Sequence, residues 1–132
     1  SLPPGMDGPP LPVRNAFAKR FGAQSMSSTR LEQLRGMLAE EPNDAFIRYA
    51  IALELKRAGK MEEAALDLEQ LLIADPKYIA CYYQLALMLI DLGRTGEAIH
   101  VCEAGSLQCI TTGDRKARAE LLELKNAIAG DE

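Results

Sequence analysis

The sequence has 132 residues, enough for one domain with a packed core. Its residues are 48% apolar but only 5% aromatic, without tryptophan, and this composition favours packed helices over a β-sandwich. The formal net charge of −4 argues against nucleic acid as a partner, because binding to phosphates requires clustered lysine and arginine.

The first 25 residues have the composition of a flexible leader. They contain five of the seven prolines and three glycines, which favour an extended or irregular chain. We therefore separate residues 1–25 from a single domain over residues 26–132. In the leader, three apolar side chains recur at intervals of four residues beside three basic ones: Val13, Phe17 and Phe21 with Arg14, Lys19 and Arg20. The same pattern also fits a weak amphipathic targeting segment.

The first predicted helix spans about residues 30–40. The segment 29–32, Thr-Arg-Leu-Glu, has the form of a capping box, in which the threonine hydroxyl and the glutamate carboxylate each accept a hydrogen bond from a backbone N–H group. Leu31, Leu34 and Leu38 then follow at i, i+3 and i+7 and form one apolar face.

A 34-residue period organises the centre of the chain. Residues of one type recur at this interval in five pairs: Pro42 and Pro76, Ala52 and Ala86, Leu55 and Leu89, Gly59 and Gly93, and Ala64 and Ala98. Gly59 and Gly93 fall where a helix must end and the chain must reverse, since a left-handed residue there favours glycine. The alanines suit helix axes that approach to about 8–10 Å. The prolines are expected to open the next helix, where a missing N–H group is harmless.

The repeat predicts helices over about residues 45–58, 61–74, 77–92 and 96–112. The helix over 30–40 then behaves as half a repeat, because Pro42 ends it 34 residues before Pro76. A closing helix over about 115–129 carries one apolar stripe: Ala117, Leu121, Leu124 and Ile128. Such an amphipathic helix suits a cap that covers the apolar face of a last repeat.

The segments 46–61 and 82–98, with these spacings, resemble the tetratricopeptide repeat (TPR), in which small, large apolar, glycine, alanine and proline positions recur every 34 residues. The chain is also similar to small stand-alone bacterial TPR proteins. The resemblance implies an all-α fold, a short TPR-type α-solenoid. It would have two helix-turn-helix repeats (about 45–78 and 79–112), a preceding half-repeat helix and a C-terminal capping helix. Arg48, Gly105 and Ile110 depart from the family's aromatic, alanine and proline preferences, which puts the regularity of the last helix in doubt.

The sequence contains no arrangement typical of a catalytic or metal site. His100 is the single histidine, and on a helix it points about 200° away from Cys102, so the two cannot share a metal ion. A glycine-rich phosphate loop and a GxSxG motif are also missing. We therefore expect no enzyme activity, no cofactor and no metal.

Cysteine usage and the length of the apolar runs indicate a cytoplasmic protein. The three cysteines have no CxxC spacing and are expected to be small core residues in a reducing compartment. Cys102 and Cys109 lie about 10 Å apart along one helix, too far for a disulfide. The longest apolar stretch, residues 79–92, has 14 residues, whereas a bilayer requires about 20. We expect no membrane partner.

The first helix of each repeat carries a second apolar stripe beside its core stripe. The expected core residues are Ile47, Ile51, Ala52 and Leu55, and Cys81, Leu85, Ala86 and Leu89. The second stripes comprise Phe46, Tyr49 and Leu53, and Tyr83, Leu87 and Ile90. In the TPR family such second stripes line the concave groove that holds peptides or partner helices.

The resemblance therefore implies an adaptor whose groove binds a protein or peptide. TPR proteins that hold a C-terminal carboxylate use Lys, Arg and Asn at groove positions, where this chain has Tyr49, Leu53, Tyr83 and Leu87. Because that clamp is not present, we predict that the ligand is an apolar peptide or helix.

Three other interpretations fit the same residues. In the first, the six second-stripe residues are ordinary core of a closed bundle. In the second, the groove is closed by another copy and the chain is a structural homodimer. In the third, the leader occupies the groove, since a short basic, aromatic segment suits an acidic, apolar groove.

Overall fold

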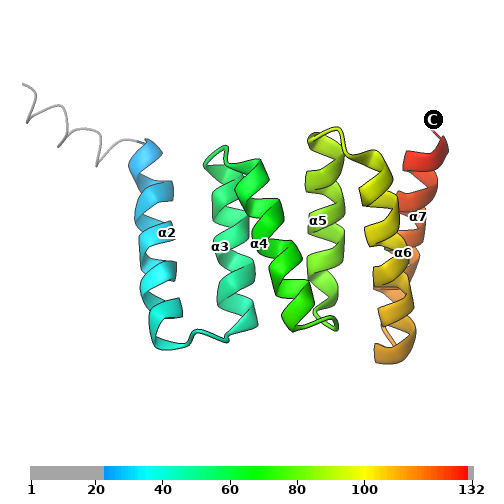
Figure 1. Cartoon of the computed structure of the whole chain (residues 1–132), viewed down its shortest axis with the longest axis horizontal. Helices are drawn as coiled ribbons and strands as arrows, with labels where there is room; N and C mark the ends of the chain where they lie inside the picture. The colour runs from blue at the N-terminus through cyan, green and yellow to red at the C-terminus, as the bar shows by residue number, and fades with distance from the viewer. Residues whose placement is uncertain (1–22, 131–132) are drawn as a thin grey trace, which may run out of the picture.

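The computed structural model describes the backbone of residues 23–130 and the side chains of residues 29–130. Within this range the chain forms α-helices and no strand. The helices are α2 (Ala23–Glu40), α3 (Ala45–Arg57), α4 (Met61–Ala74), α5 (Ile79–Asp91), α6 (Thr95–Thr112) and α7 (Arg115–Gly130). Figure 1 shows them in one row, with successive helices running in alternate directions and with α2 and α7 at opposite ends. The predicted all-α architecture is confirmed.

Helix α2 begins earlier than the sequence pattern indicated. It starts at Ala23, so residues 29–32 lie inside the helix and the predicted capping box is wrong. Of the predicted leader, residues 1–22 lie outside the described residues, and residues 23–25 already belong to α2. The apolar face of this helix is confirmed, because Leu31 and Leu34 are buried and Leu38 packs against the core.

The repeat prolines lie in the turns and not at the first helical positions, so that part of the prediction is wrong. Helix α3 begins three residues after Pro42, and its N-cap is Asp44, whose Oδ1 accepts a 3.0 Å hydrogen bond from the Ile47 N–H group. Pro76 also lies three residues before its helix, α5. Its carbonyl oxygen accepts a 2.6 Å hydrogen bond from the Tyr82 hydroxyl, which ties the turn to α5.

Left-handed glycines end three of the helices. Gly59 and Gly93 have φ angles of 83° and 78°, as predicted for the turns after α3 and α5. The residue after each glycine donates its N–H to the carbonyl oxygen five residues earlier, at 2.9 Å and 2.8 Å. Both predicted turns are confirmed. A third turn of the same kind, at Gly113 with φ of 76°, joins α6 to α7 and was not predicted.

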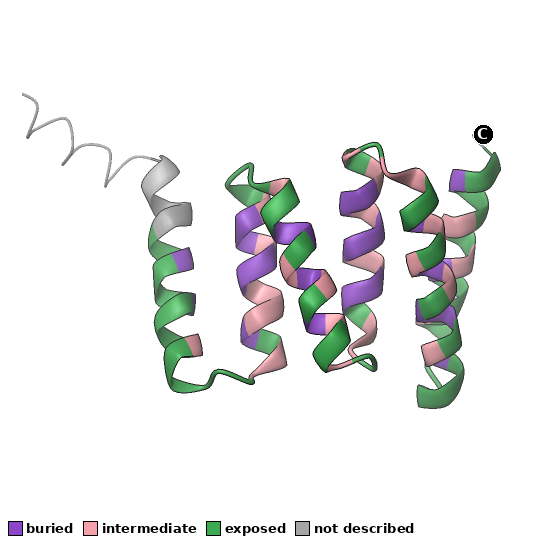
Figure 2. Ribbon diagram, in the orientation of Figure 1, coloured by how far each residue is buried: buried purple, intermediate pink, exposed green. Residues whose placement is uncertain are grey.

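The core runs along the whole row of helices (Figure 2). Helix α5 packs against three others, α4, α6 and α7, and therefore contributes to the central part of this core. Both predicted core stripes are confirmed as buried: Ile47, Ile51, Ala52 and Leu55, and Cys81, Leu85, Ala86 and Leu89. Tyr82 and Met88 of α5 are buried as well. The paired alanines of the repeat are all fully buried, which lets neighbouring helices approach closely.

Helix α6 departs from the repeat pattern at two residues. It has 18 residues where α4 has 14, because Ile110 replaces the proline of the first repeat and the helix continues. A β-carbon at Gly105 would stand 2.7 Å from Cγ of Tyr82 and 2.9 Å from Cδ1 of Leu121. Glycine at this position therefore allows α5 and α7 to lie close to α6, and the last helix pair keeps its packing.

Candidate functional site

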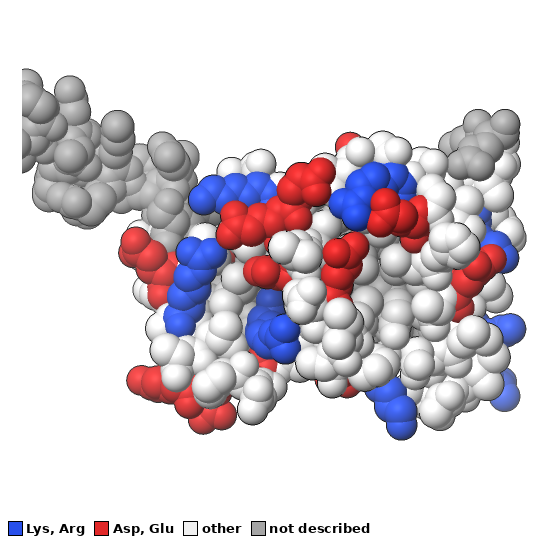
Figure 3. All heavy atoms as spheres, viewed as in Figure 1, with Lys and Arg blue, Asp and Glu red and all other residues white. Residues whose placement is uncertain are grey.

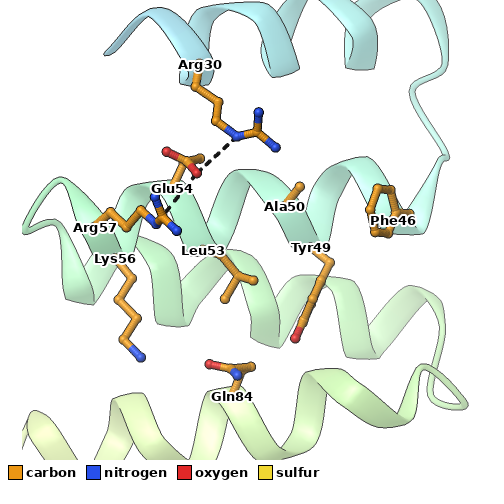
Figure 4. A pocket seen from close by; sticks show the side chains of 9 residues that line it. All are labelled: Arg30, Phe46, Tyr49, Ala50, Leu53, Glu54, Lys56, Arg57 and Gln84. Carbon is orange, nitrogen blue, oxygen red and sulfur yellow. Dashed lines mark ion pairs between the residues drawn. The ribbon is translucent and has the colours of Figure 1, made fainter. Parts of the chain in front are cut away.

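A pocket of about 720 Å³ opens between α2, α3 and α5 (Figure 4). Its lining comes from three helices: Arg30 of α2; Phe46, Tyr49, Ala50, Leu53, Glu54, Lys56 and Arg57 of α3; and Gln84 of α5. The second stripe predicted for α3 thus lies along this pocket, and the structure brings its three members together. We call this pocket the α3 groove.

Tyr49 and Leu53 form the apolar wall of the α3 groove. Both side chains are half-buried and pack against the core, whereas Phe46 remains 67% exposed. The Tyr49 ring lies 5.3 Å from that of Tyr78 at an angle of 45°. Burial and, to a smaller extent, the neighbouring Tyr78 and Cys81 raise the pKa of Tyr49, so its phenol stays neutral at physiological pH.

One end of the α3 groove carries a buried carboxylate between two arginines. The Glu54 side chain is only 8% exposed, and its Oε2 lies 3.2 Å from Nε of Arg30 and 3.9 Å from Nε of Arg57. Figure 4 shows Arg30 reaching down from α2 toward Glu54, and Lys56 extending on the side of α5. The ion pair between Arg30 and Glu54 also links α2 to α3.

The α3 groove is basic, whereas the interpretation with a bound leader assumed an acidic groove. Among the described residues, three basic side chains and one acidic side chain line the α3 groove. A basic leader therefore does not match this groove in charge, and the expectation of an acidic groove is wrong at this site.

The second stripe predicted for α5 lies elsewhere. Tyr83 lines a separate pocket of about 270 Å³ between α5 and α7, together with Asp114, Lys116 and Glu120. Leu87 and Ile90 are half-buried on α5 and line neither of these two pockets. The six residues predicted as one groove are thus divided between the α3 groove, the pocket at α7 and the surface of α5.

No family model matches the chain. A TPR repeat-containing protein of Pseudomonas aeruginosa is 31% identical over 91 residues, which cover 69% of this chain and 87% of that protein. The chain belongs to the TPR family. The predicted family and the short TPR-type solenoid are confirmed.

Solved TPR structures show the same arrangement of helices. The solution structure of a tetratricopeptide repeat domain protein from Salinibacter ruber superposes with a TM-score of 0.67 at 33% identity, over 69% of this chain and 92% of that chain. The TPR2B domain of yeast Sti1, in a complex with pHsp70, has a TM-score of 0.73 at 17% identity, over 87% and 91% of the two chains. At that identity the yeast domain shares the fold alone.

Five charged or polar residues that line the α3 groove were not predicted as site residues of this TPR domain: Arg30, Glu54, Lys56, Arg57 and Gln84. Lys56 and Arg57 follow Leu53 at i+3 and i+4, so extending the α3 stripe by one turn would have included them. Arg30 and Gln84 come from other helices, and no local pattern indicates that they face the same space.

A second charged cluster lies at the turn between α5 and α6. The Arg94 guanidinium holds Glu97 through two contacts of 2.7 Å and lies 3.4 Å from Glu62 and 3.6 Å from Glu69 of α4. Figure 3 shows acidic and basic side chains gathered along this edge of the molecule. Hydrogen bonding to Arg94 lowers the pKa of Glu97. Because Arg94 joins α4 to α6, we assign the cluster to the stability of the solenoid.

Neither a metal site nor a membrane span occurs in the described part of the chain. Residues 23–130 contain no group of three His, Cys, Asp or Glu side chains placed to hold an ion. No helix among them is long and apolar enough to cross a bilayer.

A small pocket of about 170 Å³ between α2, α3 and α4 is lined by Arg35, Arg48 and Asp67 with two apolar side chains.

Proposed function

We propose that this TPR protein is a protein–protein interaction module, an adaptor that binds a peptide segment or helix of another protein in the α3 groove. The observation that carries the proposal is the exposed aromatic side chain of Phe46 beside a preformed pocket of about 720 Å³. Pockets of roughly 300–1,000 Å³ with apolar walls and a few polar groups are typical of binding sites.

The shape of the α3 groove supports a helix or extended peptide as the ligand. Tyr49 and Leu53 provide an apolar wall along α3, and Gln84 faces them from α5. Amphipathic helices bind such grooves through apolar anchors at helical spacing. The yeast TPR2B domain, solved in its complex with pHsp70, is an example of this fold with a protein partner.

The groove interpretation competes with two alternatives, a homodimer that closes the groove and a leader that occupies it. The leader alternative is weakened by charge, because its basic residues would meet Arg30, Lys56 and Arg57. Light scattering of the full chain over a wide concentration range separates the homodimer from the adaptor. We expect a monomer; a dimer that Phe46→Ser dissociates would favour the structural homodimer.

Peptide selection tests the binding function directly. A random peptide library is selected on the full chain, and the enriched peptides are measured against the double variant Phe46→Ser/Tyr49→Ser. We expect their binding to be lost while circular dichroism shows unchanged helical content. The control is Ile73→Ser/Leu107→Ser, because these two side chains are about as exposed as Phe46 but lie on α4 and α6. Equal loss in both variants, or no enriched peptide, would contradict the proposal.

A further inference from the structure

We propose that the α3 groove selects acidic partners, specifically an internal segment of another protein that carries two carboxylates at one end and an apolar anchor at the other. This inference rests on the proposed binding function and adds the chemistry of the ligand. It replaces a purely apolar ligand with an amphipathic, negatively charged one.

The charge balance of the lining is the first argument. Arg30, Lys56 and Arg57 face the pocket, and Glu54 is the one acidic residue among the lining side chains that the structure describes. Two positive charges are therefore left over in a groove of a protein whose net charge is −4. A local reversal of sign of this kind attracts ligands of opposite charge and disfavours basic ones.

The position of Glu54 is the second argument. Its buried carboxylate lies 3.2 Å from Nε of Arg30 and 3.9 Å from Nε of Arg57. The Arg30 and Arg57 side chains are still 61% and 74% exposed, so a ligand can reach their guanidinium groups. Because Glu54 already restrains both side chains, less entropy is lost when they bind a carboxylate. Planar guanidinium groups bind carboxylates through paired hydrogen bonds.

The order of side chains along α3 defines the spacing within the ligand. Phe46 lies at one end of the groove and Arg57 at the other, with Tyr49 and Leu53 between them (Figure 4). Eleven residues of helix separate the two ends, which is about 16 Å along the axis. A ligand helix would place its acidic residues about eleven positions from its apolar anchor, and an extended segment would place them about five positions away.

The alternative occupants fit this pattern less well. The leader of this chain carries Arg14, Lys19 and Arg20 against a single acidic residue, Asp7, so its charge has the same sign as the groove. A single C-terminal carboxylate would neutralise only one of the two excess charges. An internal segment with two acidic side chains satisfies both.

The composition of selected peptides tests the inference. A random library is selected on the full chain, and enriched peptides are expected to contain more Asp and Glu than the starting library, together with Leu or an aromatic residue. The tightest acidic peptide should bind the variant Lys56→Gln/Arg57→Gln at least about tenfold more weakly, as expected for the loss of two charge-assisted contacts. Lys77→Gln/Arg115→Gln, which removes two exposed charges outside the groove, should leave its affinity unchanged.

Each other outcome has a separate meaning. Enriched neutral peptides whose binding still requires Phe46 and Tyr49 would overturn the acidic preference and leave the binding function intact. Enriched basic peptides would overturn it in favour of an occupant like the leader. If the full chain were a dimer and Lys56→Gln/Arg57→Gln dissociated it, the occupant of the groove would be a second copy of the chain. If Lys56→Gln/Arg57→Gln still bound acidic peptides as tightly as the wild type, the inference would also be wrong. If no peptide were enriched, both the binding function and the acidic preference would be wrong.

Discussion

Gly105 of α6 lies directly against the ring of Tyr82 of α5, so that a β-carbon at position 105 would stand 2.7 Å from Cγ and 2.8 Å from Cβ of that tyrosine. Tyr82 cannot easily move away, because its hydroxyl donates a hydrogen bond to the Pro76 carbonyl oxygen and its side chain is buried. The glycine therefore permits the close packing of the second repeat, at a position where the TPR pattern has alanine.

Gly105→Ala should destabilise the protein, although alanine is the better helix former. The added methyl group would overlap Tyr82 and Leu121, and overpacking of this kind costs about 1–3 kcal/mol. The gain in helix propensity of about 1 kcal/mol offsets only part of this loss. Urea unfolding followed by circular dichroism measures the difference.

Gly36→Ala is the control for that experiment. Gly36 lies within α2, and no atom stands within 4 Å of a β-carbon built there. Alanine should therefore stabilise the helix by up to about 1 kcal/mol. If both substitutions raised stability equally, the close contact between Gly105 and Tyr82 would not exist in solution.

Gly93→Val should destabilise the turn between α5 and α6 by about 1–2 kcal/mol. No neighbouring atom blocks a side chain there, so the effect isolates the backbone, whose φ angle of 78° is unfavourable for a β-branched residue. Gly93→Asn should lose less stability, because asparagine tolerates this conformation better. Equal unfolding midpoints for both variants would rule out strain as the cause.

Arg94→Gln should lower the thermal midpoint near pH 7, and the difference from the wild type should shrink as the pH falls. The folded protein lowers the pKa of Glu97 below its ordinary value of 4.5, mainly through its hydrogen bonds to Arg94. The ionised carboxylate therefore stabilises the folded state above that pH, and the contribution disappears as the carboxylate is protonated below it. Thermal melts followed by circular dichroism near pH 7 and about pH 3 test this. If the difference in thermal midpoint between Arg94→Gln and the wild type were the same at both pH values, the ion-pair assignment would be wrong.

The three cysteines should not react with a thiol reagent near pH 8 while the protein is folded. All three are buried, and burial raises the pKa of Cys81 to about 12 and that of Cys102 to about 11. The reactive thiolate is therefore scarce and shielded. Titration with a chromogenic disulfide should detect no rapid reaction in the native protein and all three thiols in guanidinium chloride. Rapid modification of one native thiol would contradict the buried positions.

Local residue patterns alone determined the helices, the repeat and the turn glycines. The 34-residue spacing placed Gly59 and Gly93 correctly because a left-handed helix end depends on one residue and its immediate neighbours. The core stripes of α3 and α5 were also predictable, since burial of one helix face follows from apolar periodicity. The start of α2 was missed because the sequence motif of a capping box can also occur inside a longer helix, where the backbone N–H groups already have helical partners.

Only the tertiary structure decided the composition of the α3 groove. Phe46, Tyr49 and Leu53 share one helix, and their common face follows from the helical period. Arg30 and Gln84 join them from α2 and α5, helices whose register against α3 depends on the packing of the whole core. The position of Glu54 between two arginines depends on the same packing. The sequence alone therefore established a TPR solenoid with an apolar face, and the packing of three helices brought Arg30 and Gln84 into the same space as Lys56 and Arg57.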